Sequence, residues 1–286
     1  MNKLKSIYRF LSPKFQAVYL DYKVLPKPRF GQGEAAHGQL YEIINANRAI
    51  YEELLRLIAG YSDVFIKIKK SADETNEDEP SWNNGFFPGL DMVGLYGMLA
   101  INKPQVFMEI GSGNSTKVAR KYCTDFKAET RIVSIDPFPR ATIDHLADEV
   151  IREPLENLRN LDLITDRLNP GDVLFIDNSH RSFANSDVTV CFLELFPRLK
   201  KGVIVHIHDI YLPEDYPQFM CDRFYNEQYL LAAFLLANPS KYRTILPNYF
   251  ISQDDQLNKI LKPLWEHPAL KGVEQHGGSY WLEINE

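Results

Sequence analysis

Two short stretches of the sequence end in acids and histidines that could do acid–base chemistry or bind a metal ion. One stretch, D-V-L-F-I-D-N-S-H, ends with Asp177 and His180, and the other, V-I-V-H-I-H-D-I, contains His208 and Asp209. An imidazole can take a proton near neutral pH, and a neighbouring carboxylate can orient the ring or share a metal ion. Ionisable groups in apolar strands are costly unless they are paired or used. These four residues are therefore candidate reactive groups, whereas His206 is expected in the core.

A glycine-containing stretch, V-F-M-E-I-G-S-G-N-S-T, reads as a strand, a tight turn and the start of a helix. Gly111 and Gly113 would let the backbone pass close to a ligand, and Glu109 stands just before them. Asp136 ends the next strand, R-I-V-S-I-D, about twenty residues later, where a carboxylate can accept hydrogen bonds from ribose hydroxyls. Thr116 occupies the position of the third glycine of a dinucleotide fingerprint. The pattern therefore predicts a nucleoside-containing ligand other than NAD.

Strand and helix patterns alternate from residue 92 onward, and these elements must position the candidate groups. Predicted strands cover residues 106–110, 131–135, 150–152, 173–176, 203–207, 242–246 and 280–284. Predicted helices cover residues 92–100, 115–123, 141–147, 158–168, 186–195, 226–236 and 257–264. This alternation predicts an α/β fold with a Rossmann-like, doubly wound, mostly parallel seven-stranded sheet. Ligands of such sheets bind beyond the carboxyl ends of the strands, where the candidate acids stand.

The first 80 residues lack this alternation and are expected to form an N-terminal helical appendage. Apolar residues within 40–58 recur at helical spacing, which predicts one helix. The acidic run 73–79 is interpreted as a solvated loop, so the expected boundary separates an appendage, residues 1–80, from a domain, residues 81–286. Basic and apolar residues alternate within 3–19. We expect this face to pack on the protein or on a partner subunit, and contact with a membrane surface is the alternative.

The composition restricts the classes of function. A net charge of -6 and a pI of about 5.7 disfavour a protein that binds nucleic acid by neutralising phosphates. The three cysteines form no C-x-x-C pair, which argues against a disulfide framework and a cysteine zinc site and fits a reducing cytoplasm. The sequence shows neither a bilayer-spanning apolar run nor a signal-peptide pattern, so a cytoplasmic protein is expected. Homo-oligomerisation stays open.

The acid before G-x-G, together with Asp136, resembles the pattern of class I S-adenosylmethionine-dependent methyltransferases. Residues 82–286 are similar to the sugar and natural-product O-methyltransferases of this family and to cephalosporin-hydroxylase-like proteins. The resemblance implies that S-adenosylmethionine lies along the glycine turn, the second strand and the end of the third strand. The cofactor-binding residues that it implies are Glu109, Gly111, Ser112, Gly113, Asn114, Ser115, Asp136, Pro137, Glu153, Pro154 and Asp177.

The same resemblance raises the question of a divalent metal. In relatives such as catechol O-methyltransferase, acids that end strands four and five hold magnesium, and a third oxygen ligand follows the second acid. Here the two acids are Asp177 and Asp209, but Ile210 stands in the third position. Because magnesium readily keeps bound water, the two acids could still hold Mg²⁺ together with water molecules. If His208 is a third ligand, a softer ion such as Mn²⁺ or Fe²⁺ is favoured.

The expected reaction is transfer of a methyl group from S-adenosylmethionine to an oxygen of a small polar acceptor, such as a sugar, a glycan or a natural product. His208 is the expected base because Asp209 follows it, with His180 in support. The aromatic residues of 81–91 and the tyrosines of 211–225 could line the ligand mouth and an acceptor lid. Two alternatives stay open: a metal-dependent hydroxylase-like enzyme on the same fold, and a non-catalytic S-adenosylmethionine-binding module.

Overall fold

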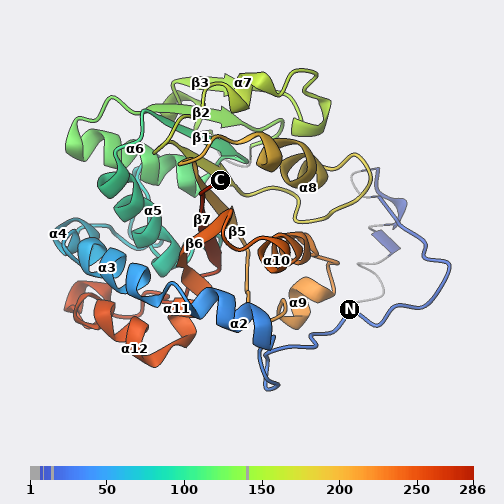
Figure 1. Ribbon diagram of the computed structural model, residues 1–286. Helices are drawn as coiled ribbons and strands as arrows, with labels where there is room; N and C mark the ends of the chain where they lie inside the picture. The colour runs from blue at the N-terminus through green and yellow to red at the C-terminus, as the bar shows by residue number, and fades with distance from the viewer. Residues whose placement is uncertain (1–6, 9, 14–15, 140–141) are drawn as a thin grey trace.

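A seven-stranded sheet forms the centre of the computed structural model, which describes residues 7–8, 10–13, 16–139 and 142–286 (Figure 1). The strand order is β3-β2-β1-β4-β5-β7-β6. The strands are β1 (Val106–Ile110), β2 (Arg131–Ile135), β3 (Glu149–Ile151), β4 (Val173–Ile176), β5 (Ile204–His208), β6 (Tyr242–Pro247) and β7 (Ser279–Ile284). Strands β1 to β5 pair in parallel, and β7 is antiparallel to both β5 and β6. This topology confirms the predicted doubly wound, mostly parallel sheet.

Helices cover both faces of the sheet, so its central strands are buried on both sides. Helices α5 (Gly89–Asn102) and α6 (Asn114–Phe126) lie on one face, and α8 (Asp187–Val190) and α10 (Glu227–Ala237) lie on the other (Figure 1). A π-helical turn, η3 (Cys191–Leu195), continues α8. Helix α5 is apolar on nearly all sides because it packs between α6 and α3 (Arg48–Ala59). The helices predicted at 92–100, 115–123, 186–195 and 226–236 are therefore present, with different ends.

Three predicted helices are shorter or more broken than expected. Residues 141–147 contain only the 3₁₀ turn η1 (Asp144–Leu146), and Ala141 lies outside the described residues. Residues 158–168 contain only α7 (Asp162–Thr165), which follows the turn η2 (Leu155–Asn157). Residues 255–265 divide into α12 (Asp255–Asn258), η5 (Lys259–Leu261) and α13 (Lys262–Trp265). Apolar side chains three residues apart share one side of a 3₁₀ turn as well as of an α-helix, so their spacing does not separate the two.

The residues before α5 pack against the same core as the sheet. The helix predicted at 40–58 is two helices, α2 (Gly38–Asn45) and α3, because the chain turns at Ala46 and Asn47, and asparagine favours turns. Tyr51 bridges the break by donating a hydrogen bond to the carbonyl oxygen of Ile44 at 2.6 Å. The remaining helices and turns are α4 (Ser62–Phe65), α9 (Gln218–Cys221), α11 (Asn248–Gln253), η4 (Phe196–Arg198) and η6 (Pro268–Leu270). The boundary expected at residue 80 stays a prediction.

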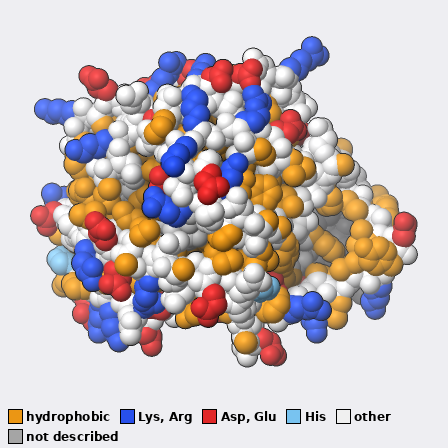
Figure 2. Space-filling view, in the orientation of Figure 1, with side chains coloured by type: hydrophobic (Ala, Val, Ile, Leu, Met, Phe, Trp, Pro, Cys, Tyr) orange, Lys and Arg blue, Asp and Glu red, His pale blue; other side chains and the backbone are white. Residues whose placement is uncertain are grey.

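An extended N-terminal arm, residues 16–36, runs along the outside of the molecule. Large hydrophobic side chains such as Val18, Tyr19 and Leu25 are exposed on it, and Figure 2 shows hydrophobic side chains gathered on that side of the molecule. Asp215 fastens the end of the arm by accepting hydrogen bonds from the backbone N–H groups of Arg29 and Phe30. Of the mixed face predicted within 3–19, residues Lys3, Lys5, Arg9, Lys14 and Phe15 lie outside the described residues. No described helix is long and apolar enough to cross a membrane.

Candidate active site

The carboxyl ends of four parallel strands lie at the same level of the sheet. Ile110 of β1 pairs with Ile135 of β2 on one side and with Ile176 of β4 on the other. Ile176 in turn pairs with Ile207 of β5. The residues that follow these isoleucines are Gly111, Asp136, Asp177 and His208. The register therefore brings the groups predicted for cofactor binding and for catalysis to one edge of the sheet.

The glycine turn after β1 uses its two glycines for different reasons. Gly111 has a φ of 85°, and a Cβ atom there would lie 2.0 Å from the carbonyl oxygen of Asp177. Gly113 has an extended φ of 169°, and a Cβ atom there would have no neighbour within 4 Å. Gly113 instead borders a cavity of about 200 Å³, together with Asn114, Ser115, Phe86 and Asp177. Gly111 is thus required by the fold, whereas Gly113 keeps space open beside α6.

Glu109 lies beneath this turn and is fully buried. Its carboxylate accepts hydrogen bonds from the hydroxyl groups of Ser115, Thr116 and Ser134, with the Ser115 bond at 2.7 Å. Burial raises the pKa of Glu109 to about 7, although these hydroxyl groups lower it in part. The carboxylate therefore ties the turn to α6 and β2. This contact also explains Thr116, because its hydroxyl group fills the position where a dinucleotide fingerprint has glycine.

A second cavity, of about 370 Å³, extends from the glycine turn past the end of β2. Asp136 lines it and accepts hydrogen bonds from the backbone N–H and hydroxyl groups of Ser112, at 2.9 and 3.0 Å. The other predicted cofactor-binding residues that line it are Gly111, Ser112, Pro137, Pro154 and Asp177. Leu155, which was also expected near the ligand at the end of the third strand, lines the wall, whereas Glu153 is exposed and Glu156 lines the wall instead. The sequence-based prediction also missed Phe138, Asn178 and Asp187, which belong to this wall.

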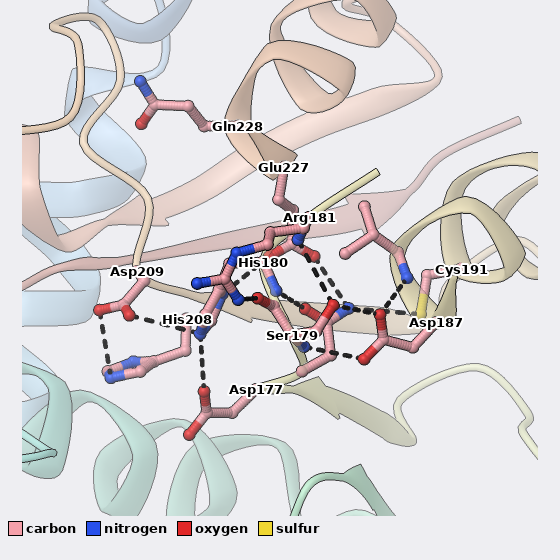
Figure 3. Close-up of polar contacts among 12 residues, drawn as sticks. Asp177, Ser179, His180, Arg181, Asp187, Cys191, His208, Asp209, Glu227 and Gln228 are labelled. Carbon is pink, nitrogen blue, oxygen red and sulfur yellow. Dashed lines mark hydrogen bonds and ion pairs between the residues drawn. The ribbon is translucent and has the colours of Figure 1, made fainter. Parts of the chain in front are cut away.

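His180 lies among three carboxylates (Figure 3). Its Nδ1 atom is 3.0 Å from an oxygen of Glu227, and its Nε2 atom is 3.3 Å from Asp177 and 3.4 Å from Asp209. Burial alone would lower the pKa of His180, but Asp177, Glu227 and Asp209 raise it well above its ordinary value. Both ring nitrogens therefore face hydrogen-bond acceptors, and the imidazole acts as a double donor. Glu227, from the first turn of α10, was missed by the sequence-based prediction.

His208 is held by a hydrogen bond on one side of its ring and faces a buried carboxylate on the other. Its Nε2–H group donates to the carbonyl oxygen of Phe86 at 3.0 Å, and the same nitrogen is 3.8 Å from Asp209. Its Nδ1 atom is 3.8 Å from the fully buried carboxylate of Asp91, another residue that the sequence-based prediction missed. Burial lowers the pKa of His208, but the charges of Asp177, Asp209 and Asp91 raise it above its ordinary value. His208 thus fixes the Phe86 loop, the loop that contains Phe86 and precedes α5.

His206 lies deeper in the sheet, as expected for a core residue. Its ring stacks on Phe175 with a centroid distance of 4.2 Å and meets the edge of Trp281 at 4.6 Å. Neither ring nitrogen has a hydrogen-bond partner among the described residues. Burial lowers the pKa of His206 well below its ordinary value, so the ring stays neutral. His206 therefore packs in the core, directly below His208, whose ring centroid lies 5.9 Å away.

A third cavity, of about 500 Å³, opens between the Phe86 loop and the segment that follows β5. His180, His208 and Asp209 line it, and so do Tyr211 and Tyr225 from the segment predicted as an acceptor lid. Tyr216, from the same segment, is fully buried instead. Asp177 is the residue that borders all three of these cavities. Its carboxylate is therefore where a ligand on the glycine turn and a ligand in this third cavity would meet.

Residues 108–210 match a family model described as a methyltransferase domain. This part of the chain is therefore similar to a methyltransferase domain. It begins in β1, ends just after Asp209, and contains the glycine turn and the acids that follow β2, β4 and β5. The match confirms the resemblance to the class I methyltransferases that was drawn from Glu109, the glycine turn and Asp136. No curated protein matches the chain.

Several solved methyltransferases are distant structural neighbours. The MycE methyltransferase from the mycinamycin biosynthetic pathway, in complex with Mg, SAH and mycinamycin VI, is 17% identical with a TM-score of 0.38. That comparison covers 63% of this chain and 45% of the neighbour, so the chain spans less than half of its length. The SAH-bound methyltransferase PaMTH1 of Podospora anserina is 16% identical, with a TM-score of 0.42 and coverage of 86% and 96%. The plantazolicin methyltransferase BpumL, with a monoazolic desmethylPZN analog and SAH, is 14% identical, with a TM-score of 0.43 and coverage of 85% and 99%.

The described residues do not arrange the predicted metal ligands as a metal site. Over the described ranges, no group of three or more His, Cys, Asp or Glu side chains is placed to hold a metal ion. The imidazole of His180 faces both Asp177 and Asp209, where a shared cation would have to lie. Ile210, in the position of the third ligand, is an apolar residue and is fully buried. The set Asp177, Asp209 and His208, as these side chains lie, therefore does not fit a metal ion.

Proposed function

We propose that the protein transfers a methyl group from S-adenosylmethionine to an oxygen of a small polar acceptor. The observation that carries this proposal is the shared wall at Asp177, which borders both the cavities along the glycine turn and the cavity at His208. Transfer of a methyl group requires donor and acceptor to be aligned at van der Waals contact, so their sites must adjoin. The polar lining of the third cavity supports a polar acceptor.

The residues of the first two cavities suit the parts of S-adenosylmethionine. The carboxylate of Asp136 is suited to the ribose hydroxyl groups, Pro137 and Leu155 to the adenine ring, and the open space beside Gly113 to the methionine moiety. When bound, S-adenosylmethionine supplies a methyl group that its sulfonium has already activated. The protein then has to hold the acceptor oxygen in line and remove its proton.

Within this proposal, Asp177 accepts the proton of the acceptor hydroxyl group. Its side chain is 44% exposed and faces the junction of the cavities, so an acceptor can reach it. His180 has carboxylates on both ring nitrogens and His208 donates to Phe86, so neither ring offers a free lone pair at the junction. His180 instead holds Asp177 and Asp209 in position, and His208 holds the loop above them. His208 as the base, the expectation from the sequence, is the competing assignment.

The experiment is methyl transfer from labelled S-adenosylmethionine to a panel of hydroxylated metabolites and glycans, detected by mass. Asp177→Asn keeps the shape of the side chain and is expected to lower turnover about a hundred- to ten-thousand-fold, the usual cost of losing a general base. Asp73→Asn, in an exposed loop, is the matched control and should keep full turnover. His208→Asn should lose less than Asp177→Asn, because it removes a loop contact and not the base.

Calorimetric titration with SAH and with NAD tests the cofactor independently of any acceptor. Binding of SAH but not NAD by the wild type is the expected result. Tight binding of NAD without binding of SAH would overturn the proposed function. A larger loss of turnover in His208→Asn than in Asp177→Asn would return the role of base to His208, and turnover that is abolished by a chelator would show that a metal is needed after all.

A further inference from the structure

Two arginines lie against one tyrosine ring in the wall of the third cavity. The guanidinium carbons of Arg181 and Arg223 are 5.0 and 4.5 Å from the centroid of the Tyr225 ring. Arg181 is fixed further, because its Nε–H group donates to the carbonyl oxygen of Arg223 and its Nη1–H group donates to that of Ser179, each at 2.9 Å. These bonds and ring contacts orient the two side chains without neutralising their charges.

Neither guanidinium forms an ion pair within the described part of the chain. Eight other arginines do pair with a carboxylate within 4.0 Å: Arg48, Arg56, Arg120, Arg131, Arg152, Arg167, Arg198 and Arg243. Arg181 and Arg223 therefore bring two positive charges without an ion pair to the same tyrosine ring, in a protein whose net charge is -6, and Asp222 is the acid that lines the adjoining cavity with them. A fixed guanidinium fork is the side chain best suited to bind a carboxylate or a phosphate.

Both arginines border two cavities. They line the 500 Å³ cavity that holds Asp177 and His208, and they also line an adjoining cavity of about 590 Å³ beside Phe183 and Phe224. A molecule in the first cavity can thus reach them from the side of the reactive groups. The carboxylates of Asp177 and Asp209 would repel an anion, so the charges of the wall favour one orientation, with the anionic end at the arginines and a neutral hydroxyl group at Asp177.

We propose that Arg181 and Arg223 bind an oxyanion of the methyl acceptor, so that the substrate is an anionic hydroxylated molecule that carries a phosphate or a carboxylate. This proposal rests on the proposed function, because it takes the 500 Å³ cavity as the acceptor site. It narrows the acceptor from any small polar molecule to an acidic one. Prior orientation of Arg181 by the backbone lowers the cost of ordering it when the anion binds.

The test uses inorganic phosphate and acetate as probes of the pair, in titrations followed by calorimetry or NMR at constant ionic strength. Arg223→Gln and the double variant Arg181→Gln/Arg223→Gln are compared with Arg159→Gln, an exposed arginine that lines none of the cavities described above. Wild type and Arg159→Gln are expected to bind a probe anion. Arg223→Gln should weaken this binding by roughly ten- to a hundred-fold, the usual weight of a hydrogen bond to a charged group.

The two probes distinguish which anionic group the acceptor carries. Stronger binding of phosphate indicates a phosphorylated acceptor, and stronger binding of acetate indicates a hydroxy acid. Unchanged anion binding in the Arg223→Gln and double variants, or no binding of either anion by the wild type, would overturn the proposal. Titration with SAH is run on every variant. Normal SAH affinity shows that the variant is folded, whereas absence of SAH binding in the wild type counts against the proposed function and not against the anion site.

Discussion

Gly111→Ala is expected to destabilise the protein and to disturb the site at the same time. The new side chain would have two separate costs. A φ of 85° is unfavourable for alanine by about 1 to 2 kcal/mol. In addition, the Cβ atom would lie 2.0 Å from the carbonyl oxygen of Asp177, so the backbone after β4 must move, at the cost of overpacking, about 1 to 3 kcal/mol. We therefore expect a loss of about 2 to 5 kcal/mol in the free energy of unfolding.

Gly171→Ala is a matched control for the first cost alone. Gly171 has nearly the same φ, 89°, but a Cβ atom there would have no neighbour within 4 Å. Its expected loss is therefore only about 1 to 2 kcal/mol. The difference between the two variants isolates the contact with the backbone of Asp177.

Urea denaturation measures both losses, and calorimetric titration with SAH measures the consequence for the site. Because the displaced carbonyl group belongs to Asp177, Gly111→Ala should weaken SAH binding roughly tenfold or more, while Gly171→Ala should leave it unchanged. Equal losses of stability in the two variants would show that a Cβ atom at residue 111 does not collide with the backbone of Asp177. Unchanged SAH affinity in a destabilised Gly111→Ala variant would show that the ligand does not depend on this junction.

Three further predictions concern other buried or paired groups. Asp136→Ala should weaken SAH binding by about 1 to 3 kcal/mol in calorimetry, because hydroxyl partners are left unpaired. The pKa of Glu109, raised by burial to about 7, implies that its contribution to stability is present below its ordinary pKa of 4.5 and is lost as the pH rises through 7. In the wild type, the free energy of unfolding should therefore decline by up to about 3 kcal/mol between pH 4.5 and pH 7. Urea denaturation should show that Glu109→Gln removes this decline. Asp254 has its pKa lowered to about 2 by Arg48, so the stability from this pair is present above the ordinary pKa of 3.8 and lost as the pH falls through 2. Asp254→Asn should cost about 1 to 2 kcal/mol at pH 7, with no further loss on acidification, if α3 is anchored to the end of α11 as observed.

The sheet could be predicted from the sequence because its parallel strands are buried on both faces and read as short continuous apolar runs. Every strand was located to within one residue of its observed ends. The short turns between β2 and β4 could not be predicted in the same way. Leu155 in η2, Leu161 just before α7 and Ile164 in α7 bury their side chains, so their spacing looks like that of one long helix although the helical elements here have only three or four residues.

The groups at the carboxyl ends of the strands were also predictable, because topology alone brings Asp136, Asp177 and Asp209 to one edge. Their partners were not. Asp91 and Glu227 stand in the first turns of α5 and α10, where an acid is common because it interacts favourably with the helix dipole. Nothing in the sequence distinguishes these two buried acids from ordinary first-turn acids. Only the tertiary structure shows that they face His208 and His180.

The position of His180 bears on both the predicted metal ligands and the proposed role of Asp177. One ring nitrogen faces Asp177 and Asp209 together, while Glu227 holds the other at 3.0 Å. A divalent cation shared by the two acids would have to displace this ring and leave the fully buried carboxylate of Glu227 with Asn178 as its remaining donor, which is costly. The same ring keeps Asp177 turned toward the junction of the cavities, so a fixed imidazole supplies the positioning that a metal ion would otherwise give.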